Sequence, residues 1–228
     1  ILIYEVYLLV FYLPKSTSIY IGKQYEIILL IIIRRVFKDL SQLEFTEDWF
    51  SVKADLNFTY DLTATIILFL PIFIFYRLNQ TRITKPKKEI PADSELAKFI
   101  KIKNIIATLL IPILFVLAVY SFGHWVYESF FSIKQAVTSI TDINKIFFDE
   151  FFTVLILIDV LLLLFSFLHV AKFNKVIRNS GFIISTILLK LSFSADGLLN
   201  IILIIVAVLF GVIILAIHNQ FEKLDDVV

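Results

Sequence analysis

The chain has 228 residues, of which 59% are hydrophobic and 18% charged, and its mean hydropathy is +0.90. Soluble domains are about 45–50% apolar, so a soluble fold of this length could not bury so much apolar surface. A net charge of +1 argues against a nucleic-acid partner, and the lack of cysteine excludes disulfides, thiolate metal sites and cysteine nucleophiles.

Long apolar runs predict seven membrane helices, because about 20 apolar residues cross a bilayer core of roughly 30 Å. In chain order they are 1–13, 24–40, 60–77, 103–126, 148–170, 180–193 and 197–217. The first run is cut short, and the chain has no methionine, so we expect residue 1 not to be the native start. The runs 24–40 and 180–193 are the least apolar and could be partly buried or tilted. The predicted fold class is all-α, a polytopic transmembrane helix bundle.

The distribution of basic residues predicts an orientation. Fourteen of the 21 lysines and arginines fall on one predicted face and three on the other, and an excess of basic residues marks the cytoplasmic face. Residues 81–102 then form a basic cytoplasmic loop in which Lys85, Lys87 and Lys88 could contact anionic lipid or a partner. Residues 221–228 form a cytoplasmic tail. We expect a multi-pass protein of a bacterial cytoplasmic membrane.

The two halves of the chain resemble each other at an offset of 154 residues. Glu5 aligns with Asp159, and one residue later in register Arg35 aligns with Lys190. The pattern predicts two parallel four-helix repeats, related by an axis along the membrane normal. The repeats would be residues 1–80, without their first helix, and residues 103–220.

In each copy an acid within one helix is followed by a helix that ends in basic residues. These are Glu5 with Arg34 and Arg35, and Asp159 with Lys190. The pattern resembles the phosphate-starvation-inducible family of small four-helix bacterial membrane proteins. The resemblance implies a polytopic cytoplasmic-membrane protein and no particular reaction.

Glu5 and Asp159 are the most informative residues, because an ionisable group within a membrane helix is costly and is often functional. They could form a proton or cation relay tuned by Arg35 or Lys190. Alternatively, each acid could pair with the base of a neighbouring helix and fix the packing. The recurrence of acid and base together favours pairing.

Other residues carry weaker signals. His124 and Glu128 are four residues apart and could share a metal ion, but a third ligand is not evident, and a polar interfacial pair is the favoured interpretation. His169 and His218 stand near predicted helix ends, where a cation complements the helix dipole. The sequence has no phosphate loop, serine elbow, zinc motif or dinucleotide fingerprint. We therefore expect no enzyme activity, no cofactor and no metal.

The favoured function is a non-catalytic membrane subunit or scaffold of a larger assembly. Its partners would be the lipid bilayer and other membrane subunits, or a second copy of the chain. The alternative is an ion channel or proton-coupled transporter that uses Glu5 and Asp159. An intramembrane enzyme is the least favoured hypothesis, because the residues do not suggest a converging catalytic group.

Overall fold

A computed structural model describes residues 2–40, 43, 53–83, 95–131, 143–169 and 173–225. These residues form seven α-helices joined, where the connections are described, by short turns. The helices are α1 (Leu2–Tyr12), α2 (Thr17–Leu40), α3 (Lys53–Ile83), α4 (Glu95–Phe131), α5 (Ile143–His169), α6 (Phe173–Phe193) and α7 (Gly197–Asp225). The prediction of an all-α helical bundle is confirmed.

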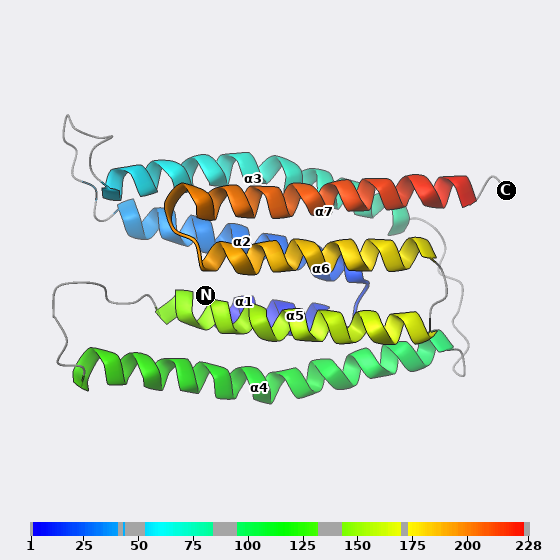
Figure 1. The fold of residues 1–228 in the computed structure, drawn as a ribbon, viewed down its shortest axis with the longest axis horizontal. Coiled ribbons are helices and arrows are strands. Elements are labelled where there is room, and N and C mark those ends of the chain that lie inside the picture. The colour runs from blue at the N-terminus through cyan, green and yellow to red at the C-terminus, as the bar shows by residue number, and fades with distance from the viewer. Residues whose placement is uncertain are drawn as a thin grey trace.

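The helices run up and down in one bundle (Figure 1). α1, α3, α5 and α7 run in one direction, and α2, α4 and α6 return. We call the two ends of the bundle the α1–α2 turn end, where residues 13–16 lie, and the α6–α7 turn end, where residues 194–196 lie. The helix ends that flank 84–94 and 170–172 both lie at the α1–α2 turn end, together with the end of α7. The order of the described helices thus agrees with the alternating topology predicted from the sequence.

Four of the described helices are long and apolar enough to cross a membrane. The qualifying segments are Asp55–Gln80, Ile100–Tyr120, Asn174–Phe193 and Gly197–Leu224. Their backbone hydrogen bonds are made within each helix, which is what a hydrocarbon solvent requires. The 11 described residues of α1 extend over about 16 Å of helix.

Most predicted helix boundaries differ from the structure by several residues, and two of the differences involve polar or charged residues. The predicted helix 24–40 begins seven residues earlier, at Thr17, because its first turns bury the polar residues Ser18 and Gln24 against other helices rather than exposing them to lipid. The predicted loop 81–102 is shortened by α3, which continues to Ile83, and by α4, which begins at Glu95. Lys85, Lys87 and Lys88 lie outside the described residues.

α2 supplies more buried apolar residues than any other described helix, and it packs against α1 and α3 and also contacts α7. Aromatic rings connect it to two neighbours. The Tyr25 and Phe75 centroids lie 5.0 Å apart, and those of Phe75 and Phe182 lie 5.9 Å apart. Aromatic side chains of α2, α3 and α6 therefore pack against one another. Large apolar side chains also cover the outside of α3, α4 and α7, as expected where lipid is the solvent.

Candidate functional site

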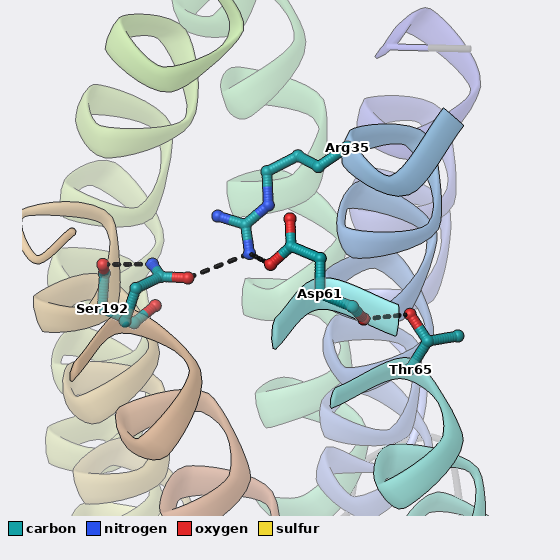
Figure 2. Close-up of polar contacts among 5 residues, drawn as sticks. Arg35, Asp61, Thr65 and Ser192 are labelled. Atoms are coloured by element: carbon teal, nitrogen blue, oxygen red, sulfur yellow. Dashed lines mark hydrogen bonds and ion pairs between the residues drawn. The ribbon is translucent and has the colours of Figure 1, made fainter. Parts of the chain in front are cut away.

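A group of polar side chains joins four helices at the α6–α7 turn end. We call Arg35, Asp61, Asn200 and Ser192 the Arg35 cluster (Figure 2). Arg35 Nη2 donates to Asp61 Oδ1 and to Asn200 Oδ1, at 2.9 Å in both cases. The Asn200 amide in turn donates to the carbonyl of Ser192 at 2.5 Å. A single guanidinium therefore connects α2 with α3 and α7, and Asn200 extends the connection to the end of α6.

Glu5 adds α1 to the same end of the bundle. Its side chain is fully buried, and Oε2 lies 3.5 Å from Arg34 Nη2. Neither carboxylate oxygen makes a hydrogen bond of ordinary geometry within the described residues. The contact is therefore a loose ion pair that places the charge of Arg34 beside a carboxylate that would otherwise be isolated.

Asp159 lies away from this end, between α2 and α6. Its Oδ2 accepts a hydrogen bond from the Gln24 amide at 3.4 Å. The Thr186 hydroxyl lies 2.9 Å from Gln24 Oε1 and 3.1 Å from the Phe182 carbonyl oxygen. Its single proton can be donated to either acceptor or shared between the two. Gln24 thus bridges an acid on α5 and a hydroxyl on α6.

A small cavity opens beside Asp159, with a volume of about 20 Å³. Tyr20 and Lys103 also line it, and both are buried. Lys103 Nζ donates to the carbonyl of Lys15, in the turn between α1 and α2, at 3.2 Å. The cavity is therefore lined by an acid, a base and a phenol from three different helices.

A third polar contact lies one residue along α2 from Gln24. The Tyr25 hydroxyl and Ser185 Oγ are 2.8 Å apart, and Ser185 donates to the Ala207 carbonyl, also at 2.8 Å. Gly211 makes this junction possible, because a Cβ there would overlap the Tyr25 hydroxyl and lie 2.7 Å from Cζ of the ring. The phenol of Tyr25 therefore packs directly against the backbone of α7 at Gly211.

The two ends of this polar series are separated by apolar side chains. Ile28, Ile32 and Leu189 are buried and lie, in sequence, between the residues of the Asp159 region and those of the Arg35 cluster. A continuous polar path between Asp159 and Arg35 is therefore not present among the described residues of α2 and α6.

His218 lies at the opposite end of the bundle from the Arg35 cluster. It is almost fully buried, with its Nε2 3.4 Å from Arg178 Nη1 and 3.5 Å from Glu222 Oε1. Asn219 beside it donates to the Leu78 carbonyl at 2.9 Å. These contacts tie the end of α7 to α6 and α3.

The residues singled out from the sequence are only partly brought together. Glu5 lies beside Arg34, whereas Arg35 contacts Asp61 of α3. Lys190 lies in the last turn of α6, and the described hydrogen bond of Asp159 is with Gln24. The side chains of His124, Glu128 and His169 lie outside the described residues. Within the part of the chain that is described, no three His, Asp or Glu side chains gather as a metal site.

Sequence reasoning missed Gln24, Asp61, Lys103 and Asn200. Each is a polar or charged residue within or at the edge of an apolar run, which is the signal that drew attention to Glu5 and Asp159. Asn200 is the clearest case, because it interrupts the most apolar segment of the chain. Neutral Asn and Gln side chains within a membrane helix are therefore as informative as acids, because their polar groups also need partners.

The fold and its buried polar contacts define a class: a multi-pass helical membrane protein whose helices are connected by interhelical hydrogen bonds and ion pairs. Comparison with protein-family models, curated proteins and solved structures finds no match to this chain. The resemblance to the phosphate-starvation-inducible family therefore stays a prediction.

Proposed function

We propose that the protein is a non-catalytic membrane subunit or scaffold of a larger assembly. The observation that supports this proposal is that charged side chains of the bundle pair with side chains of other helices. Glu5, Arg35 and Asp159 each face a partner on another helix. Side chains committed in this way hold the bundle together, as pairing within a membrane interior requires.

The outer face of α4 is the surface that best suits a partner. α4 lies at one edge of the bundle (Figure 1) and packs mainly against α5 and α1. Only 22% of its apolar segment is buried within the chain, compared with 33–44% for the other three spans. Leu109 and Val116, two helical turns apart, are both exposed on it. In this proposal an apolar helix of another membrane subunit covers this face.

Native-membrane extraction into polymer nanodiscs tests the proposal. We expect the chain to be isolated at a fixed stoichiometry with one other membrane protein, measured by native mass spectrometry. Leu109→Trp and Val116→Trp would add bulk to the α4 face and should reduce the partner's occupancy at least several-fold. Ile213→Trp is the matched control, because Ile213 is equally exposed on α7.

Recovery of the unmutated chain as a monomer from such nanodiscs would contradict the proposal. Equal loss of the partner in the α4 variants and in Ile213→Trp would contradict the assignment of the α4 face.

The proposal includes an orientation and an internal repeat. The α1–α2 turn end would face the cytoplasm of a bacterial cell, because Lys15 lies in that turn and the helix ends that flank residues 84–94 lie at the same end. The repeats would be residues 1–80 and 103–220. The parallel course of α2 and α6, and of α3 and α7, supports this arrangement (Figure 1).

A further inference from the structure

The cavity beside Asp159 has the size of a single water molecule. Its volume is about 20 Å³, and a polar cavity needs only about 10–15 Å³ to hold one water. It lies where the α1–α2 turn, α2, α4, α5 and α6 meet, and its wall also includes the polar residues Thr17 and Asn179 and apolar side chains such as Leu162 and Ile183. A solute would not fit there.

The polar groups around the cavity are deeply buried and incompletely satisfied. Tyr20, Lys103 and Asp159 are 2%, 6% and 8% exposed. The Tyr20 hydroxyl has no hydrogen-bond partner of ordinary geometry among the described residues. A buried hydroxyl without a partner is destabilising, and a water in the cavity would give it one.

The acid has room for a further hydrogen bond. A carboxylate offers about four acceptor positions, whereas the Gln24 amide donates to Asp159 at a long 3.4 Å and Thr186 is the other hydroxyl or amide that interacts with it as a hydrogen-bond donor. Lys103 donates to the Lys15 carbonyl and also lines the cavity, which places its ammonium group beside the acid.

We propose that this cavity is a proton-binding site, in which one water connects Asp159, Lys103 and Tyr20 and the carboxyl group of Asp159 takes up and releases a proton. On uptake, a proton from the aqueous phase at the α1–α2 turn end passes through the water and forms an O–H bond at Asp159. On release, that O–H bond breaks and the proton returns to water. Lys103 remains the neighbouring cation throughout.

The charges around Asp159 come from two helices. Lys103 of α4 interacts electrostatically with Asp159, and Arg178 of α6 lies within electrostatic range of Lys103. The groups of α2 and α6 that face the acid, Tyr20, Gln24 and Thr186, are neutral. Lys103 is therefore the charged residue whose removal should favour the protonated carboxyl group of Asp159, alongside the effects of burial and of the Gln24 hydrogen bond.

Infrared spectroscopy of the full chain in lipid nanodiscs, titrated with pH, tests the proposal. We expect a carbonyl band of a protonated carboxylic acid that disappears as the pH rises and is absent in Asp159→Asn. Lys103→Met should move the midpoint of this titration by about one unit to higher pH, because the carboxylate loses a nearby opposite charge. Lys101→Met is the matched control, since Lys101 is exposed on the same helix and should leave the midpoint unchanged.

A second measurement needs no substitution. A hydrophobic carbodiimide reacts with protonated carboxylic acids in a membrane, and mass spectrometry of the labelled unmutated chain should find the adduct on Asp159, decreasing as the pH rises. Tyr20→Phe, which removes only the hydroxyl, should also shift the titration, by less than Lys103→Met.

The proposal is overturned if no titrating band depends on Asp159, if Lys101→Met shifts the midpoint as much as Lys103→Met, or if the carbodiimide leaves Asp159 unlabelled across the pH range. The site belongs to the chain itself, so its titration should persist whether or not a partner subunit is bound.

Discussion

At one end of the bundle, the guanidinium of Arg35 supplies the charge that allows the carboxylate of Asp61 to be buried. Its Nη2 atom donates both to Asp61, at 2.9 Å, and to Asn200, so one nitrogen with two N–H groups holds acceptors from two other helices. The lysine-glutamate pair of α2, Lys23 and Glu26, differs in kind, since both of its side chains are partly exposed and lie on one helix.

A double-mutant cycle should distinguish these two ion pairs. We expect Arg35→Met and Asp61→Asn to show a coupling energy of about 1–3 kcal/mol, because the loss of Arg35 leaves the buried carboxylate of Asp61 without its counter-charge. The control cycle, Lys23→Met with Glu26→Gln, should give less than about 1 kcal/mol. Reversible unfolding in mixed micelles measures both. Equal coupling in the two cycles would argue against the structural importance of the Arg35 cluster.

At the scale of the helices, close packing depends on where a side chain is missing. Gly211 lies in the middle of α7, and its lack of a side chain lets the Tyr25 ring lie against the helix backbone. The same ring then reaches Ser185 on α6. A junction of three helices therefore depends on one small residue, in keeping with the general use of small residues at membrane helix interfaces.

Gly211→Ala should separate α2 from α7. The added methyl group overlaps the Tyr25 hydroxyl, and overpacking of this kind costs about 1–3 kcal/mol. We expect a lower midpoint of thermal unfolding in detergent, with partial recovery in the double variant Gly211→Ala with Tyr25→Phe. Gly123→Ala is the matched control, because a Cβ there meets no atom within 4 Å, and it should be neutral or slightly stabilising. A loss of stability as large in Gly123→Ala would contradict this account.

At the scale of the whole molecule, the alternating helices fix which connections share a side of the membrane. The α1–α2 turn and the end of α7 lie at one end of the bundle, and the α6–α7 turn lies at the other (Figure 1). The chain has no cysteine, so a single introduced cysteine reports its own location without interference.

We expect cysteines at Lys15 and Lys223 to react with a membrane-impermeant thiol reagent from the cytoplasmic side only. A cysteine at the exposed residue Ser194 should react only from the opposite side. Labelling is measured on intact cells and on inverted membrane vesicles. If Lys15→Cys and Lys223→Cys were labelled from different sides, the bundle could not have the alternating topology of the structure.

The amino-acid sequence by itself determined the solvent, the helical class and the approximate positions of the helices. This was possible because a helix in hydrocarbon satisfies its backbone within a continuous stretch of chain, so that the apolar segment 197–217 predicts α7 without reference to any other residue. The acids Glu5 and Asp159 could be singled out in the same way, because their cost depends on the apolar residues immediately around them.

Only the tertiary structure decided which polar residues meet. Gln24 lies 135 residues from Asp159 in the chain, and Asn200 lies 165 residues from Arg35. Their contacts depend on how each helix is rotated and which neighbour it faces, and hydropathy carries no information on either. The same reason applies to Gly211. In the sequence it indicates only a residue that weakens a helix, whereas in the structure it is the place where Tyr25 packs against the backbone of α7.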